Sequence, residues 1–179
     1  MPPRHRLVHA VTMLQPGRMV LAGADLEYLP GFLSPGEADD LLAALLARVP
    51  WQQPVVQLFG RTFRSPRLAA WYGDPGAVYQ YSGLVNEPLP WLSNLTVLRR
   101  QIEHRFRQSF NSALLNCYRN GADGMGWHRD REPELGKNPT IASISLGGSR
   151  RFVLQHSRQV DMTRLELRPK HGSLLLIRG

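Results

Sequence analysis

Cysteine, lysine and long apolar runs are the scarce features of this chain, and each shortage excludes a class of protein. Cys117 is the only cysteine among 179 residues, so neither an internal disulfide nor a cysteine-based zinc site can form. No run of about 18 apolar residues occurs, so we expect no transmembrane helix. The start from Met1 to Arg6 is basic, but the segment after it is too short and too polar for a signal peptide. The sequence therefore predicts a cytoplasmic protein that does not contact a membrane.

The charge has one dominant sign and is carried almost entirely by arginine. The chain has 22 Lys and Arg against 14 Asp and Glu, a formal net charge of +8, and only Lys137 and Lys170 are lysines. Arginine suits bidentate contacts with phosphate, and a basic balance favours a polyanionic partner such as nucleic acid. A GC-rich genome also raises the arginine content, so the charge alone leaves both explanations open. The length fits one domain with a substantial core.

Two helices are predicted before residue 110. Ser34 at the N-cap, Pro35 at N1 and Glu37 at N3 form a capping box, which predicts a helix to about Arg48. A second amphipathic helix is expected over residues 92–108. The apolar stripe of the first helix consists of Leu41, Leu42, Leu45 and Leu46, and that of the second of Leu95, Leu98, Ile102 and Phe106.

Short strands separated by turn residues account for most of the remaining chain. We expect one strand within residues 25–32, hairpins over residues 51–81, and a series of short strands from residue 112 onward. The strands of that series are 112–118, 140–146, 151–155, 162–167 and 173–177. Helices followed by closely spaced strands indicate an α+β chain whose β part is a jelly roll or barrel.

His128 and Asp130 are the strongest candidates for metal ligands. In an extended backbone, residues two apart point to the same side, so the imidazole and the carboxylate converge on one point. They would supply two ligands of the 2-His-1-carboxylate triad that holds non-haem Fe(II). A surface pair of histidine and aspartate has the same spacing, so the motif by itself leaves both interpretations open.

Polar residues precede and follow this pair. Asn116 and Tyr118 share one face of the strand before it by period two, as a small carboxylate cosubstrate would require. The alternative is a solvated strand face. Glu132 lies two residues beyond Asp130 and could accept a hydrogen bond from a base amine, or could simply face solvent.

Two aromatic segments could contact a nucleic acid. Phe59 and Gly60 are expected at a hairpin tip, where the ring could enter a base stack while arginines at 61, 64 and 67 hold phosphates. The alternative is a hairpin whose phenylalanine packs on the core. Tyr79 and Tyr81 alternate with Gln80, so both rings lie on one side, where they could stack a base or line the core.

Taken together, these segments resemble the AlkB family of Fe(II)/2-oxoglutarate dioxygenases, which repair alkylated nucleic acid by direct reversal. The similarity runs from about residue 25 to the end and is closest to the DNA-repair subgroup with a finger hairpin. The segments that carry it are Ser65 to Asp74, Phe110 to Arg119, Trp127 to Gly136, Pro139 to Arg150 and His171 to Leu175.

The resemblance implies a role for each candidate residue. His128 and Asp130 would ligate Fe(II), and Asn116 and Tyr118 would hydrogen-bond 2-oxoglutarate. The finger that probes the duplex would be Phe59, Gly60 and Arg61. The pocket for the damaged base would be lined by Tyr79, Gln80 and Tyr81, with Glu132 helping to read the base.

The resemblance also implies a fold and a domain layout. The fold would be a double-stranded β-helix, which is a jelly-roll variant, with N-terminal helices and hairpins forming a nucleotide-recognition lid. We expect a single dioxygenase domain over residues 1–179, with an N-terminal arm at 1–24. The lid and its supporting helices would occupy residues 25–110, and a C-terminally incomplete jelly-roll core residues 111–179.

The implied activity is oxidative demethylation of alkylated DNA, with RNA as a further candidate substrate, by a monomer. Fe(II) and 2-oxoglutarate would act with O2 as co-substrate to hydroxylate an N-methyl group of 1-methyladenine or 3-methylcytosine type. Formaldehyde is then released, and the base must leave the stack to react.

One part of the family pattern is missing from this sequence. The family places a second histidine ligand and one or two arginines after the strand that begins at His171. Neither His156 nor His171 matches that ligand, so we expect it to lie beyond residue 179 of a longer protein. The alternative is a catalytically incomplete module of the same fold that binds damaged nucleic acid.

Overall fold

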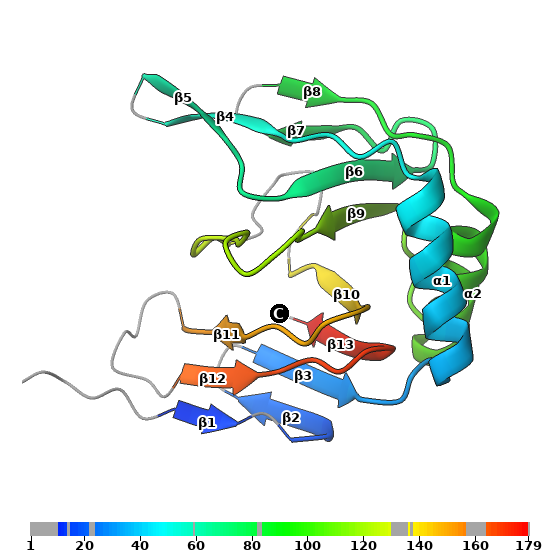
Figure 1. Cartoon of the computed structure of the whole chain (residues 1–179). Helices are drawn as coiled ribbons and strands as arrows, with labels where there is room; N and C mark the ends of the chain where they lie inside the picture. Colours follow the sequence, from blue (N-terminus) through cyan, green and yellow to red (C-terminus); the bar gives the residue numbers. More distant parts are fainter. Residues whose placement is uncertain are drawn as a thin grey trace, which may run out of the picture. The chain divides into compact units, whose positions relative to one another are not determined.

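The computed structural model describes residues 11–13, 15–21, 24–58, 60–81, 84–129, 136, 138–156 and 164–178. Of residues 11–12, 21, 24, 56–58, 79–81 and 84–86 it describes the backbone alone. The chain divides into two compact units, one formed by residues 1–43 and 140–179 and the other by residues 44–139. Strands predominate, and the described residues form two helices (Figure 1).

The first unit contains two sheets. A four-stranded antiparallel sheet has the order β10 (Thr140–Ser145), β13 (Ser173–Arg178), β3 (Ala24–Leu29) and β2 (Gly17–Leu21). A three-stranded sheet places β12 (Arg164–Leu167) between β1 (Val11–Met13) and β11 (Phe152–Leu154). Each sheet joins strands from both ends of the sequence, as Figure 1 shows by their colours.

A cluster of buried side chains joins these two sheets. It comprises Leu26 and Tyr28 of β3, Leu165 and Leu167 of β12, and Leu175 of β13. On β3 and β12 the buried residues alternate with Asp25, Glu27, Arg164 and Glu166, so each strand presents one apolar face to the core. Two sheets that pack through their apolar faces are consistent with the jelly roll predicted from the sequence.

Helix α1 (Pro35–Arg48) begins with the predicted capping box. The Ser34 N–H donates to Glu37 Oε2 at 2.8 Å, and the Glu37 N–H donates to Ser34 Oγ at 3.4 Å. The hydrogen bonds from Ser34 lower the pKa of the Glu37 carboxyl. The expected leucine stripe is wrong at Leu46, which is 55% exposed, because the buried stripe passes through Leu41 and Leu45 instead.

The second unit contains three antiparallel pairs and helix α2 (Ser93–Phe106). The pairs are β4 (Val55–Leu58) with β5 (Arg61–Arg64), β6 (Leu68–Gly73) with β9 (Ser112–Cys117), and β7 (Tyr79–Tyr81) with β8 (Leu84–Asn86). The predicted hairpins over residues 51–81 are thus confirmed in part, since β6 pairs with the distant β9. Helix α2 buries Leu95 and Ile102, two residues of its predicted apolar face.

The N-terminal strands differ from the predicted layout. Residues 17–29 form β2 and β3 in one sheet with β10 and β13, with β2 at its edge; the sequence indicated a loose arm or an edge strand over residues 1–22 and a strand from residue 25, but not these partners. Arg178 of β13 donates to the carboxylates of Asp25 and Glu27, so this pairing depends on residues some 150 positions apart. Local periodicity cannot reveal such a partner. The single-domain layout otherwise stays a prediction.

None of the helices in the described part of the chain combines the length and apolar content needed to cross a membrane. Cys117 is a free, partly buried thiol.

Candidate active site

The second unit presents Asn116 on the strand predicted to bind the cosubstrate. β9 and β6 run antiparallel, with Asn116 opposite Ala69. By the alternation of side chains, Asn116 shares one face of the pair with Leu114. The backbone of Tyr118 leaves the strand directly after Cys117, so the tyrosine stands at the end of the same face, partly buried.

The side-chain amide of Asn116 has a buried atom that lacks a hydrogen-bond partner in the described part of the chain. That atom is Oδ1. A buried polar atom without a partner costs about 1–3 kcal/mol. A half-turn of the amide exchanges the oxygen with the NH2 group, so the same position can offer a donor. Asn116 therefore fits a residue that hydrogen-bonds a ligand.

Arg67 is a buried cation next to this position, which the sequence did not predict. It is 6% exposed, its Nη1 donates to Ser65 Oγ at 3.1 Å, and its Nε has no partner within the described residues. Arg67 comes directly before β6, whose first residue Leu68 is opposite Cys117, the neighbour of Asn116 on β9. The three arginines expected to hold phosphates thus separate, because Arg61 and Arg64 are exposed.

In the sequence, the burial of Arg67 is indicated only by its position directly before an apolar strand. Arg67 follows Pro66 and precedes the buried run of β6, whose pattern is apolar on both faces. A charged residue that enters such a strand is rarely buried unless it has a partner. No carboxylate pairs with Arg67 in the described parts of the chain, so a bound anion could fill that role.

The loop after β9 is held by an ion pair. The Arg119 N–H, Nε and Nη2 donate to the Asp123 carboxylate at 2.9, 2.8 and 2.9 Å, and Asp123 is 6% exposed. The side-chain hydrogen bond with Asp123 raises the pKa of the Arg119 guanidinium. The Gly124 N–H donates to the Pro66 carbonyl, which attaches the loop to the start of β6. The predicted turn is therefore a fixed support for the residues that follow.

His128 comes directly after this support, with its ring oriented by the backbone. Its Nδ1 lies 3.0 Å from the Gly126 carbonyl oxygen. When Nδ1 carries the proton and donates to that carbonyl, the lone pair is on Nε2, which is the form that binds a metal. The residue is exposed, and so is its neighbour Trp127 at 67%.

The remaining members of the predicted metal segment lie outside the described residues. These are Asp130 and Glu132. Among the residues that are described, no group of three His, Cys, Asp or Glu side chains could hold a metal ion. The metal site therefore stays a prediction, and the orientation of His128 fits it.

The predicted finger is the hairpin of β4 and β5. Gly60 has φ +71° at its tip, in the left-handed region that favours glycine. All four residues of β5 are exposed, including Arg61 and Phe63, which is 48% exposed. Phe59 lies outside the described residues, so its position as a wedge is untested. Figure 1 shows this hairpin extending past β6 and β9 within its unit.

The predicted base pocket is described only as a backbone. Residues 79–81 form β7, with Gln80 opposite Val85 of β8. The expectation that the rings of Tyr79 and Tyr81 lie on one side stays a prediction. The directions and contacts of these rings, and of the Gln80 amide, are outside what the structure describes.

The comparisons with known proteins match most of this chain. The model of the 2OG-Fe(II) oxygenase superfamily covers residues 25–179. The human alpha-ketoglutarate-dependent dioxygenase alkB homolog 3 is 39% identical over 158 residues, which are 84% of this chain and 54% of the relative. The human DNA oxidative demethylase ALKBH2 is 39% identical over 166 residues, 87% of this chain and 62% of the relative. The Arabidopsis thaliana protein of the same name is 30% identical over 183 residues, 88% of this chain and 58% of the relative. The chain thus spans little more than half the length of the relatives it matches.

Proposed function

The chain belongs to the AlkB family within the 2OG-Fe(II) oxygenase superfamily, and from this premise we propose that it is an oxidative demethylase of N-alkylated bases in DNA. The lesions are of the 1-methyladenine and 3-methylcytosine type. The names of the relatives support the reaction class, and the net charge of +8 supports a polyanionic substrate. RNA is a second possible substrate.

The observation that carries this proposal is the hydrogen-bonding state of Asn116, on β9, and of Arg67, which directly precedes β6. It combines an amide with an unpaired buried atom and a buried cation without a carboxylate. Both features stabilise the protein only when an anion or another polar ligand is present. A dicarboxylate such as 2-oxoglutarate meets that requirement, with Asn116 and Tyr118 as hydrogen-bonding residues.

His128 and Asp130 would hold the iron. With 2-oxoglutarate and O2, the bound Fe(II) supplies the oxidising chemistry that hydroxylates the N-methyl group. The Gly126 carbonyl orients the imidazole of His128, and the Arg119–Asp123 pair fixes the loop that presents it. A base that has lost its methyl group as formaldehyde returns to its unmodified form.

The lid would be formed by the hairpins of the second unit. The finger comprises Phe59, Gly60 and Arg61, and the base pocket Tyr79, Gln80, Tyr81 and Glu132. An aromatic ring at a hairpin tip suits the gap left when a base is rotated out of the duplex. The exposed arginines of β5 are placed to hold the neighbouring phosphates.

Turnover on a defined lesion tests the proposal. The full-length protein, with any sequence that follows residue 179, is incubated with Fe(II), 2-oxoglutarate, ascorbate and an oligonucleotide carrying one 1-methyladenine, and succinate and formaldehyde are quantified. We expect the two products in equal amounts, and none from an unmodified oligonucleotide. Preferential binding of the methylated oligonucleotide without turnover would instead favour the module that only binds damage.

We also propose that the protein acts as a monomer in the cytoplasm. The single thiol suits a reducing compartment. Sedimentation equilibrium at several concentrations tests the oligomeric state, and a mass that rises with concentration would contradict it.

A further inference from the structure

The three-stranded sheet of the first unit carries a group of cations, none of which has been assigned a role above. On β12, Leu165 and Leu167 face the core, so Glu166 lies on the opposite face. The register of β11 and β12, continued by one residue, places Arg151 directly opposite Arg168. The side chains of these two arginines are 57% and 61% exposed.

One carboxylate orients both guanidinium groups. Glu166, whose side chain is 14% exposed, accepts a hydrogen bond from Arg151 Nε at 2.7 Å, and its other oxygen lies 4.0 Å from Arg168 Nε. Both arginines therefore turn their Nε edges toward Glu166. No partner is recorded in the described part of the chain for the terminal nitrogens of either group. The edge with two Nη groups is the one that matches a phosphate bidentately.

The pairing of Arg151 with Arg168 is unfavourable without a further anion. Like charges directly opposite each other in an antiparallel pair destabilise it. A single carboxylate offsets only part of that repulsion. Lys170, two residues beyond Arg168 and exposed, adds a third positive charge. This arrangement is stabilised by a ligand that carries more than one negative charge.

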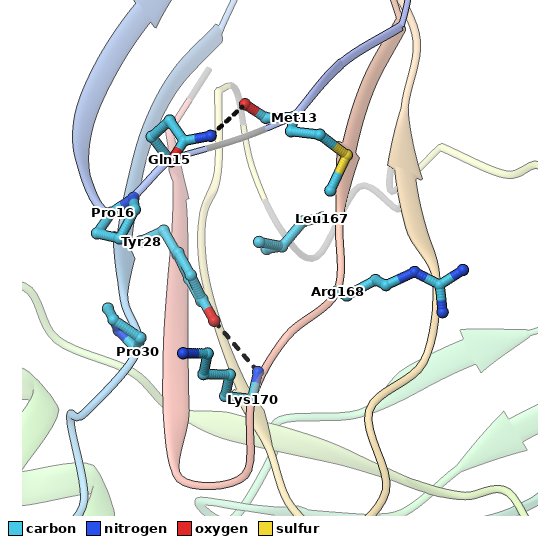
Figure 2. Close-up of a pocket in the computed structure, with 8 residues that line it drawn as sticks. All are labelled: Met13, Gln15, Pro16, Tyr28, Pro30, Leu167, Arg168 and Lys170. Carbon is cyan, nitrogen blue, oxygen red and sulfur yellow. Dashed lines mark hydrogen bonds between the residues drawn. The ribbon is translucent and has the colours of Figure 1, made fainter.

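A hollow beside Arg168 and Lys170 separates the directions of their two side chains. Its volume is about 340 Å³, and its walls include Met13, Tyr28 and Leu167. In Figure 2 the Lys170 side chain extends toward Tyr28 and Pro30, while the Arg168 guanidinium points away from the hollow. The Tyr28 hydroxyl accepts from the Lys170 N–H at 3.2 Å, which fixes the backbone that carries the ammonium group.

We propose that Arg151, Arg168 and Lys170 form a second nucleic-acid contact, which binds consecutive phosphates of one strand. This inference rests on the proposed function, which already brings a polyphosphate to the protein. An acidic peptide is the competing partner, because a carboxylate also fits the guanidinium edge.

The salt dependence of binding tests this contact. A labelled 20-nucleotide single strand is titrated with the full chain, without iron, at several NaCl concentrations. Each phosphate contact adds about 0.7 to the magnitude of the slope of log K against log [salt]. Arg168→Gln and Lys170→Gln should each lower the slope magnitude by about that amount and weaken binding at least about threefold at 0.1 M salt.

Arg18 provides a control that is matched in charge and exposure. Its side chain is 62% exposed, but its Nε and Nη2 both donate to Asp25, at 3.0 and 2.8 Å. Arg18→Gln should leave the slope unchanged. Equal slopes for the Arg18→Gln and Arg168→Gln variants would overturn the proposal, because they would indicate a general effect of net charge. Arg168-dependent binding of polyglutamate that is tighter than that of the oligonucleotide would overturn it as well.

Turnover separates this inference from the proposed function. Demethylation of the 1-methyladenosine nucleoside, which carries no phosphate, should be the same in wild type and the Arg168→Gln variant. Normal turnover with identical salt slopes would overturn the second contact alone. A wild-type chain that binds the strand through Arg168 without demethylating any substrate would contradict the demethylase and leave the contact supported.

Discussion

Arg67 is buried, positively charged and without a carboxylate partner among the described residues. Such a group destabilises the folded state unless an anion is bound, since replacing buried charges with apolar residues of similar size is often neutral or stabilising. Residues that lower stability in this way are typical of binding sites. A substitution of Arg67 should therefore affect activity and stability in different ways.

We predict that Arg67→Met lowers activity and does not lower stability. The apolar side chain of similar length removes the uncompensated charge, so the free energy of unfolding in urea should stay equal or rise by about 1–3 kcal/mol. The kcat/KM for 2-oxoglutarate-dependent turnover should fall at least about tenfold, as expected for the loss of a charge-assisted hydrogen bond. An exposed arginine of the same unit, changed as Arg100→Met, is the control and should alter neither quantity. A large loss of stability in the Arg67→Met variant would assign the residue to packing.

The sequence identified the chemistry of the site better than its geometry. Asn116 with Tyr118, and His128 with Asp130, could be proposed because the members of each pair are two residues apart, which is the period of a strand; their roles stay predictions. Arg67 was grouped with exposed arginines, because nothing in a single sequence tells whether an arginine beside a proline is buried. Its burial depends on the pairing of β6 with β9, which joins residues 39 to 49 positions apart.

Secondary structure that depends on neighbouring residues could be predicted from the sequence, whereas strand pairing between distant residues could not. The capping box at Ser34 and the starts of β9, β10 and β13 were predicted, because they depend on neighbouring residues. The parallel pairing of β1 with β12 and the addition of β2 and β3 to the core sheet were not. Those arrangements depend on partners that come near only after folding.

Asp74 connects three elements of the second unit. Its Oδ1 accepts from Arg99 Nη1 of α2 at 2.7 Å and from Trp91 Nε1 at 2.8 Å, and Asp74 directly follows β6. The hydrogen bond from Arg99, then that from Trp91, lowers the pKa of the Asp74 carboxyl below 3.8. A lowered folded-state pKa means that the ionised carboxylate stabilises the fold. This contribution is present above the unfolded-state pKa and is lost as the pH falls through the folded-state pKa.

We therefore predict a pH-dependent effect of Asp74→Asn. At pH 7 the variant should have a lower Tm than wild type, because the amide cannot pair with the Arg99 guanidinium. The difference should decrease as the pH falls below about 4, where wild type also loses the charge. Thermal unfolding followed by tryptophan fluorescence between pH 3 and pH 8 measures it. A difference in Tm that is constant over that range would show that charge is not the cause.

The hairpin of β4 and β5 provides a second prediction at this scale. Phe59→Ala should reduce demethylation of a duplex substrate about tenfold more than that of a single strand, because only a duplex needs its gap filled after base rotation. Phe63→Ala is the matched control, since this ring lies on the same hairpin and is already 48% exposed. Equal losses on both substrates would indicate that Phe59 packs in the fold. The measurement is formaldehyde release from each substrate at saturating 2-oxoglutarate.

At the scale of the whole molecule, the net charge attracts nucleic acid over a long distance, whereas iron is bound by direct contact with its ligands. The net charge of +8 is spread over the chain and attracts a polyanion from any direction within a Debye length of about 10 Å in 0.1 M salt. Iron binding instead depends on a few atoms at one point. Loss of a single ligand should therefore remove the metal and leave the attraction for nucleic acid intact.

Asp130→Ala tests this separation. Partners in the outer shell of a metal site typically change affinity 10–100-fold, so loss of a ligand should weaken Fe(II) binding by roughly 100-fold or more. The variant also gains one unit of net positive charge, so its affinity for an unmodified strand should stay equal or increase slightly. Asp40→Ala changes the net charge equally at an exposed position of α1 and should retain iron. Calorimetric titration with Fe(II) under nitrogen and anisotropy with a labelled strand give both affinities on the same preparations. Iron affinity that falls equally in both variants would attribute the effect to net charge, and the assignment of Asp130 as a ligand would then be wrong.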